Sequence, residues 1–246
     1  MPKIRKVIDK SDNNVIDNGL LPDVRFFGLL VGKTGSSKTT LMVNMLASPE
    51  FPYDKIFKGE HIYVFSGSLN SDEKLKKLIE YKEIPESNLY EGFDNDTLNE
   101  LYSKLEDEYM ERKANKEDVE YPLVILDDLS FALSRGKDFN SIKRFAQNSR
   151  KLAISVLITT QHYSQVELAV RNNISFAVLY ATSNRNLELI EAEHNYLPTK
   201  KDFMKMWHDN VKSKRDFLIV NYDNDGIDIY LNKDFEPIFK HSGDKP

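Results

Sequence analysis

The chain has 246 residues, of which 40% are hydrophobic and 30% charged, as is ordinary for a globular protein. The absence of cysteine excludes disulfides, thiolate metal sites and a cysteine nucleophile. No run of 18 apolar residues occurs and residues 1–17 are polar, so we expect neither a membrane-spanning helix nor a secretion signal. The net charge of −5 argues against a protein that coats nucleic acid, although residues 131–151 carry six basic side chains and one acid.

Buried and amphipathic segments alternate in the first half of the chain. Thr97 and Glu100 have the spacing of a capping box, which predicts that a helix begins there, and the charged residues 111–120 predict an exposed connection after it. The other expected elements are a buried strand at 25–31, a helix from about Lys38 to Pro49, a strand at 61–65 and a helix at 71–83.

The second half continues the alternation and closes on two candidate strands. Asp223-Asn-Asp-Gly226 between them is typical of a hairpin turn. The expected elements are strands at 123–126, 154–158 and 175–180, helices at 141–151 and 184–195, and final strands at 217–220 and 227–231.

This order of elements predicts an α/β fold with a mostly parallel central sheet flanked by helices on both faces. The C-terminal β-hairpin is expected to extend one edge of that sheet. No boundary divides the remainder, so we expect residues 1–24 to be a polar lead-in and residues 25–246 to form a single domain.

A phosphate-binding loop is predicted between the first strand and the first helix, where P-loops occur. Backbone N–H groups at 35–39 are expected to wrap the β-phosphate of ATP, aided by the positive end of the helix. Lys38 is expected to bridge the β- and γ-phosphates, and the Thr39 hydroxyl to ligate Mg²⁺. A Gly/Ser-rich turn without a ligand is the alternative. The predicted nucleotide-binding residues are Gly32, Lys33, Thr34, Gly35, Ser36, Ser37, Lys38, Thr39 and Thr40.

The loop departs from the usual pattern G-x-x-x-x-G-K-[ST] at one position. Ser37 stands where that pattern has its second glycine. We expect serine to fit there with an ordinary helical backbone.

Two acids follow the expected strand at 123–126. Asp127 has the position of a Walker B aspartate and is expected to hold Mg²⁺, directly or through water. Asp128 comes next, at the strand tip, where an acid can orient and deprotonate the attacking water. Many ATPases carry glutamate at this place, and aspartate is shorter. Taken without the P-loop, the pair would equally suit a helix cap or a turn.

A polar strand end supplies the third motif. Thr159-Thr160-Gln161 closes the strand at 154–158, and Gln161 is expected to touch the γ-phosphate or the attacking water. Polar strand ends are common, so this motif gains its meaning from the other two.

Together these motifs resemble the HerA–FtsK superfamily of DNA-pumping ATPases, and most of all the genome-packaging ATPases of poxvirus-like large DNA viruses and virophages. The matching segments are 32–40, 123–129 and 149–161, with Arg171-Asn-Asn-Ile174 as a further similarity. The resemblance implies an ASCE-type sheet in which the Gln161 strand separates the Asp127 strand from the P-loop strand. It also implies Mg²⁺-dependent ATP hydrolysis.

The resemblance further implies a ring of identical subunits with ATP at each subunit boundary. A neighbouring subunit would supply an arginine that stabilises negative charge on the transferred phosphate. Arg150 matches the family position, with Arg171 second and Arg144 third. A solvated helix end is the alternative for Arg150, because cations are favoured at helix C-termini. The implied partners are double-stranded DNA and a capsid vertex, without a membrane, in the host cytoplasm at the virus assembly site or on the virion.

Two basic segments are candidates for contact with DNA phosphates. The loop from Phe131 to Asn140, with Arg135 and Lys137, is expected either to face the pore of a ring or to be a solvated surface loop. The second segment is either the solvated face of a helix or a contact for DNA or the capsid. Its members are Lys200, Lys201, Lys205, Lys212, Lys214 and Arg215.

Two other functions stay open. A P-loop ATPase or GTPase of another class is one, although no N-K-x-D segment for guanine occurs and Asn184-Arg-Asn186 does not match it. An inactive nucleotide-binding subunit is the other, because Ser37 and Asp128 depart from the usual residues. A nuclease is not expected, since no further carboxylate cluster follows the ATPase motifs.

Overall fold

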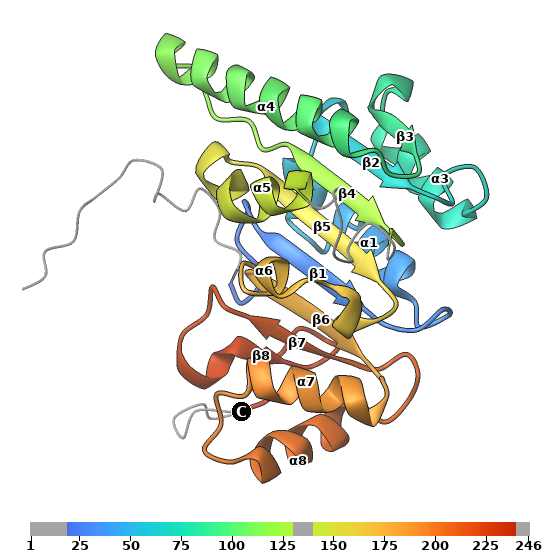
Figure 1. Cartoon of the computed structure of the whole chain (residues 1–246), viewed down its shortest axis with the longest axis vertical. Helices are drawn as coiled ribbons and strands as arrows, with labels where there is room; N and C mark the ends of the chain where they lie inside the picture. Colours follow the sequence, from blue (N-terminus) through green and yellow to red (C-terminus); the bar gives the residue numbers. More distant parts are fainter. Residues whose placement is uncertain (1–18, 130–139, 240–246) are drawn as a thin grey trace, which may run out of the picture.

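The computed structural model describes residues 19–129 and 140–239. A single eight-stranded sheet runs through these residues in the order β3-β2-β4-β5-β1-β6-β7-β8 (Figure 1). The strands from β3 to β6 in this order are parallel, and β7 and β8 continue the edge as antiparallel neighbours of β6 and of each other. The strands are β1 Phe27–Val31, β2 Ile62–Ser66, β3 Leu89–Glu91, β4 Leu123–Asp127, β5 Ser155–Thr160, β6 Phe176–Tyr180, β7 Phe217–Asn221 and β8 Tyr230–Leu231.

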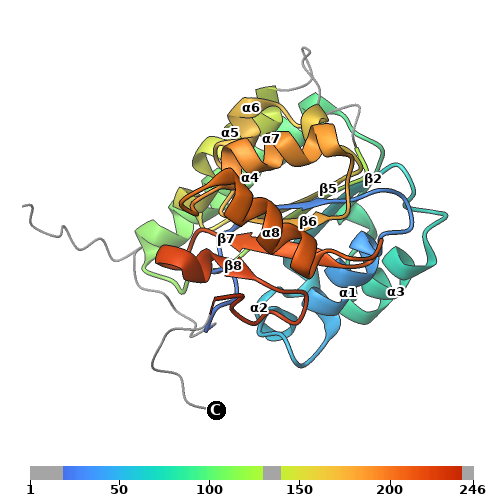
Figure 2. The same cartoon turned by 90° about the horizontal axis from the view of Figure 1, so that it is seen from below.

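Helices cover both faces of the sheet (Figure 2). One face packs against α1, α2 and α3, and the other against α4 to α8. The α-helices are α1 Lys38–Ala47, α2 Tyr53–Ile56, α3 Glu73–Lys82, α4 Asn95–Asn115, α5 Asn140–Asn148, α6 Leu168–Arg171, α7 Asn184–His194 and α8 Lys200–Asn210. Short 3₁₀ helices lie at Gly59–His61, Glu86–Asn88, Ser149–Leu152, Tyr163–Gln165 and Gly226–Ile229.

The central strands are apolar along their whole length because both of their faces are buried. In β5, Val156 and Ile158 point into the apolar layer under α4 and α5, while Leu157 points into the layer under α1. None of the helices within the described ranges is long and apolar enough to cross a bilayer.

The predicted sheet is confirmed in its main features. The strands alternate with helices, and β5, which leads to Gln161, separates the Asp127 strand β4 from the P-loop strand β1. The last two strands extend the edge beside β6, as expected.

The capping residue predicted for α4 is wrong. The helix begins one turn earlier because Asp94 has an extended backbone, and its Oδ2 accepts hydrogen bonds from the N–H and hydroxyl of Thr97 over 2.7 and 2.6 Å. The helix also continues to Asn115, so the first half of the expected connection at 111–120 is helical.

Two other boundaries differ from the prediction. The helix expected at 141–151 is α-helical only to Asn148 and then tightens into the 3₁₀ turn Ser149–Leu152. Gly226 does not close a two-residue hairpin but opens a 3₁₀ helix, which shortens the strand expected at 227–231 to β8. The short edge strand β3 was not predicted.

A buried polar cluster ties α7 to the sheet. The hydroxyl of Tyr163 lies 2.6 Å from Nε2 of His194 and 2.6 Å from a carboxylate oxygen of Glu193, which also pairs with Arg171. Nδ1 of His194 shares a hydrogen bond with the hydroxyl of Tyr222. Burial, and secondarily the charge of Arg171, lower the pKa of His194 from 6.5 to about 4.

This cluster predicts a loss of stability in acid. Because the pKa of His194 is lowered in the folded state, neutral His194 contributes to the free energy of unfolding above pH 6.5. This contribution is lost as the pH falls toward 4. The loss is about 3 kcal/mol. We therefore expect the destabilisation caused by His194→Gln to be about 3 kcal/mol smaller at pH 4 than at pH 7. Urea unfolding at both pH values measures this difference, and an equal destabilisation would contradict the prediction.

Candidate functional site

The loop at residues 32–37 leaves the carboxyl end of β1 and turns directly into α1. Gly32 N–H donates to the Thr160 carbonyl over 3.1 Å, and Ser36 N–H closes a tight turn on the Lys33 carbonyl at 3.0 Å. A Cβ at position 32 would lie 2.5 Å from Ser36 Oγ and 2.7 Å from Cβ of Tyr180, so only glycine fits. The strand, turn and helix N-terminus of a P-loop are therefore present.

The conformation expected for Ser37 is wrong. Its φ of 81° and ψ of 23° place it in the left-handed region, where P-loops have glycine, and not in an ordinary helical one. Serine carries a cost of roughly 1–2 kcal/mol in this conformation. The turn imposes it, because the chain must reverse between Gly35 and the start of α1 at Lys38.

Lys38 is buried beneath this loop. Its exposed fraction is 9%, and its amine donates to the Gly32 carbonyl over 2.6 Å. Burial lowers the pKa of this amine, while the charges of Asp128 and Asp127 act in the opposite direction. A partly desolvated cation at a helix N-terminus attracts an anion strongly.

Asp127 is buried at the tip of β4, with an exposed fraction of 3%. Its Oδ1 accepts from the Thr159 hydroxyl over 2.7 Å and its Oδ2 from the Ser66 hydroxyl over 3.2 Å. Burial raises the pKa of Asp127, and these two hydrogen bonds lower it. Ser66 was not predicted, although it ends a buried strand with a polar side chain, which is the same pattern that indicated Gln161.

Asp128 and Gln161 meet across the tips of β4 and β5. The Gln161 amide donates to the carboxylate of Asp128 over 3.0 and 3.2 Å, and the Thr34 hydroxyl donates to the Gln161 carbonyl over 3.1 Å. The N–H of Asp128 donates to the Thr159 hydroxyl at 3.0 Å. A polar chain thus connects the P-loop to both strand tips.

These groups surround a cleft of about 220 Å³. Thr40 lies just outside it, where its hydroxyl accepts from the amine of Lys74 over 2.7 Å. The predicted residues that line the cleft are Thr34, Gly35, Ser37, Lys38, Thr39, Asp127, Asp128 and Gln161, and Ser68, Asp72, Lys74 and Thr159 join them without having been predicted.

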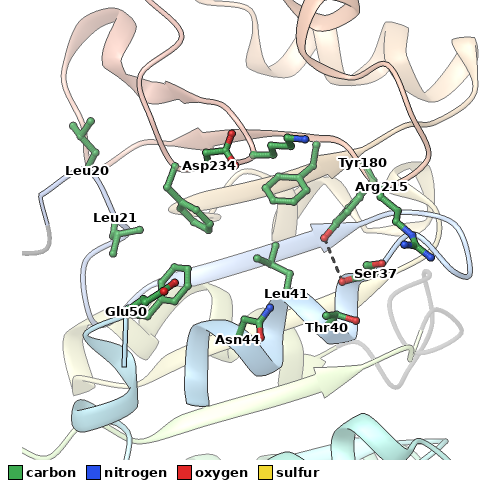
Figure 3. A pocket seen from close by; sticks show the side chains of 14 residues that line it. Leu20, Leu21, Ser37, Thr40, Leu41, Asn44, Glu50, Tyr180, Arg215 and Asp234 are labelled. Carbon is green, nitrogen blue, oxygen red and sulfur yellow. Dashed lines mark hydrogen bonds between the residues drawn. The ribbon is translucent and has the colours of Figure 1, made fainter. Parts of the chain in front are cut away.

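A larger hollow of about 610 Å³ adjoins the P-loop on the side of β6 and β7 (Figure 3). Ser37 lines both spaces, and Thr40 and Leu41 from the first turn of α1 form part of the hollow's wall. The Tyr180 hydroxyl donates to the Ser37 carbonyl over 3.4 Å. Figure 3 shows Arg215 beside this contact. The sequence motifs gave no sign of this hollow.

Metal ligation would depend on few protein groups. Within 19–129 and 140–239, no three His, Cys, Asp or Glu side chains gather as a metal cluster. The cleft does offer the hydroxyl of Thr39 and the carboxylate of Asp127, which are hard oxygen ligands of the kind that Mg²⁺ takes together with phosphate. The donor set therefore fits Mg²⁺ bound with a nucleotide.

The candidate arginines lie away from this cleft. Arg150 precedes β5 at the opposite end of the sheet, is 57% exposed, and pairs with Asp223 at 3.1 Å. Arg171 is mostly buried against Tyr163 and Glu193, and Arg144 covers the ring of Tyr102. Arg150 is therefore the most exposed of the three side chains.

Of the two basic segments, the structure describes only the second. Residues 131–139 lie outside the described residues, so the role of the loop from Phe131 to Asn140 stays a prediction. The second segment is not one helix face, because only Lys200, Lys201 and Lys205 belong to α8. Lys214 and Arg215 instead lie in the loop before β7, beside the P-loop.

Comparison with known proteins shows the family of the chain. The family model of the poxvirus A32 protein matches residues 17–227, whereas a search of curated proteins found no match. EssC (ATPases 2 and 3) from Geobacillus thermodenitrificans is similar in structure, with a TM-score of 0.61 and 15% identity over 89% of this chain and 41% of the chain in that structure. The genome packaging NTPase B204 from Sulfolobus turreted icosahedral virus 2, in complex with AMPPCP, has a TM-score of 0.53 and 15% identity over 88% of this chain and 100% of B204. These structures share the fold, and since the family match extends from before β1 to beyond β7, the chain belongs to the poxvirus A32 protein family.

Proposed function

We propose that this protein is an ATP-hydrolysing motor that translocates double-stranded viral DNA into a capsid. The observation that carries the proposal is the meeting of Lys38, Asp127, Asp128 and Gln161 in one cleft at the carboxyl edge of the sheet, in a chain of the poxvirus A32 family. The similar fold of B204, described as a DNA-packaging ATPase, supports it. The carboxyl edge of a parallel sheet is where such folds bind their ligands.

The P-loop holds the phosphates of ATP in this proposal. The N–H groups at 35–39 surround the β-phosphate, and Lys38 exchanges the Gly32 carbonyl for the β- and γ-phosphate oxygens. Thr39 and Asp127 would hold Mg²⁺, which would supply positive charge beside the phosphates. Ser66 and Thr159 fix the carboxylate of Asp127 so that it cannot rotate away.

Asp128 and Gln161 act on the attacking water. Asp128 is exposed toward the cleft and accepts the water proton, while Gln161 holds the carboxylate in place and senses the γ-phosphate. Thr34 connects Gln161 to the P-loop, so loss of the γ-phosphate changes a chain of hydrogen bonds that begins beside it.

The hollow beside Ser37 receives the nucleoside. Its walls combine aromatic rings from β6 and β7 with polar groups such as Asn44 and Asp234 (Figure 3). A space of about 610 Å³ with this mixture is typical of a site for a base and a sugar.

The motor is proposed to work as a ring of identical subunits. Arg150 of one subunit reaches the ATP of its neighbour, DNA passes through the ring, and the ring docks on a capsid vertex at the virus assembly site or on the virion. Its exposed position away from the chain's own cleft supports this role for Arg150.

Hydrolysis with and without double-stranded DNA tests the proposal. We expect Mg²⁺-dependent turnover that rises with DNA and falls about 10³-fold in Lys38→Ala, because the charge that meets the β- and γ-phosphates is gone. Lys77→Ala is the matched control, since Lys77 is an exposed lysine that does not line the cleft. The measurement is steady-state phosphate release.

The other outcomes separate the alternatives. If the rate of ATP hydrolysis in the presence of capsid were the same with and without DNA, an ATPase of another class would be favoured. Nucleotide binding without turnover under every condition would favour an inactive subunit, and Ser37 and Asp128 would then be the residues to restore to glycine and glutamate.

A further inference from the structure

We propose that Lys214, which lies outside every sequence motif of the site, binds the α- and β-phosphates of the nucleotide. This inference rests on the proposed ATP site and adds a second cation to it. Lys214 belongs to the loop at 211–216 between α8 and β7.

The sheet topology brings this loop to the phosphate site. β7 runs antiparallel to β6, so its first residue, Phe217, pairs with Tyr180 at the carboxyl end of β6. β6 is in turn the parallel neighbour of β1, with Leu179 opposite Val31, the last residue before the P-loop. The loop before β7 and the P-loop therefore share one edge of the sheet.

The amine of Lys214 lies directly over the P-loop. A Cβ built on Gly35 would be 2.8 Å from Nζ of Lys214. A side chain at position 35 would displace this amine, and the φ of +77° at Gly35 also favours glycine. Gly35 thus leaves room for a cation above the turn whose N–H groups are expected to face phosphate.

The nearby acid does not neutralise this cation. Asp216 accepts from the Ser213 N–H over 2.8 Å and pairs with Lys233 at 3.5 Å, which holds the loop in shape. Within the described part of the chain, Lys214 itself forms no ion pair or hydrogen bond. It is an exposed amine held near the P-loop by a fixed turn, available to an anion.

The position of Lys214 between the cleft and the larger hollow indicates which phosphates it contacts. Gly35 lines the cleft that contains Lys38 and Asp127, whereas Arg215, the next residue after Lys214, lines the larger hollow (Figure 3). If the γ-phosphate lies in the cleft and the nucleoside lies in the hollow, the α- and β-phosphates lie beside Lys214. These phosphates are common to ADP and ATP.

Nucleotide binding by three variants tests the inference. The dissociation constants of ADP and of the ATP analogue AMPPCP are measured by calorimetry at one salt concentration, with Mg²⁺. We expect Lys214→Ala to weaken both at least about tenfold, since it removes a charge-assisted hydrogen bond. Lys214→Arg should keep most of the affinity. Lys212→Ala, in the same loop, should bind within about twofold of the unaltered chain and controls for general charge.

Several results would overturn the inference. Affinity of Lys214→Ala equal to that of Lys212→Ala would do so, as would a loss confined to AMPPCP, which would move the amine to the γ-phosphate. If the unaltered chain bound neither nucleotide, the proposed function would fail and this inference with it. Thermal melting of Lys214→Ala confirms that it is folded, and Lys214→Arg gives an independent comparison if it is not.

Discussion

Replacing Asp128 with asparagine is expected to lower the rate of ATP hydrolysis by about 10²–10⁴-fold, the contribution of a general base. Nucleotide affinity should change little, because Asp128 is exposed and follows Asp127, the buried last residue of β4. Asparagine has the same shape and can still accept a hydrogen bond from the Gln161 amide, but it cannot take a proton from water. The measurement is the single-turnover rate with saturating ATP and DNA.

A second acid of the same cleft supplies the control. Asp72 lines the cleft but caps α3, where its Oδ1 accepts from the N–H groups of Lys74 and Leu75 over 2.8 and 3.2 Å. Asparagine caps helices about as well as aspartate, so Asp72→Asn should fold and hydrolyse ATP nearly normally. If Asp128→Asn kept more than about a tenth of the normal rate, the base would have to be another group.

The core of the site was predictable because its signals are local. Each of the three motifs is a buried strand followed by polar residues at fixed spacing. These polar residues include the P-loop, Asp127 and Gln161. The carboxyl ends of parallel strands meet at one edge, so three local patterns became one cleft without knowledge of the strand order. The order β4-β5-β1 came from the resemblance to known ATPases, and the structure confirms it.

The residues that were missed depend on contacts far apart in the chain. Ser66 reaches Asp127 only because β2 lies beside β4, and Lys214 reaches Gly35 only because β7 returns antiparallel beside β6. Neither pairing has a sequence pattern of its own. The second basic segment was therefore treated as one surface, although Lys214 and Arg215 have a different setting from the lysines of α8.

Two errors concern backbone conformation. Residue type gives only a preference for a φ angle, so Ser37 was predicted to be helical although the turn forces it into the left-handed region. Asp94 and Thr97 are both good capping residues three positions apart. Asp94 caps α4 because it is the one with an extended backbone, and the sequence does not choose between them.

Arg150→Ala is expected to lower the rate of hydrolysis by about 10³–10⁵-fold without weakening ATP binding, as loss of an arginine finger does. Arg150 precedes β5, whereas its own P-loop follows the other end of the neighbouring strand β1. The six residues of β5 separate these ends by about 20 Å, too far for Arg150 to act within its own subunit. In the proposed ring, an effect of this size would therefore come from a neighbouring subunit.

Two single variants separate this role from a structural one. Asp223→Asn removes the charge that Arg150 pairs with, but its side-chain oxygen can still accept a hydrogen bond from the Asp23 N–H. This variant should therefore fold and hydrolyse ATP nearly normally if the ion pair is not what Arg150 contributes. Lys151→Ala removes the adjacent exposed cation and should also be nearly normal. If Asp223→Asn were as inactive as Arg150→Ala, the ion pair between these residues would have a structural role.

Mixing two inactive variants decides whether the arginine acts between subunits. Lys38→Ala retains Arg150 but not its own phosphate site, and Arg150→Ala retains the phosphate site but not the arginine. In a mixed ring, some boundaries combine the intact Lys38 of one subunit with the intact Arg150 of the next. Hydrolysis should therefore reappear on mixing, up to about a quarter of the normal rate at equal amounts if boundaries act independently and subunits exchange freely. Finger action within one subunit predicts no recovery at any ratio, so this recovery distinguishes the two arrangements without knowledge of the ring size.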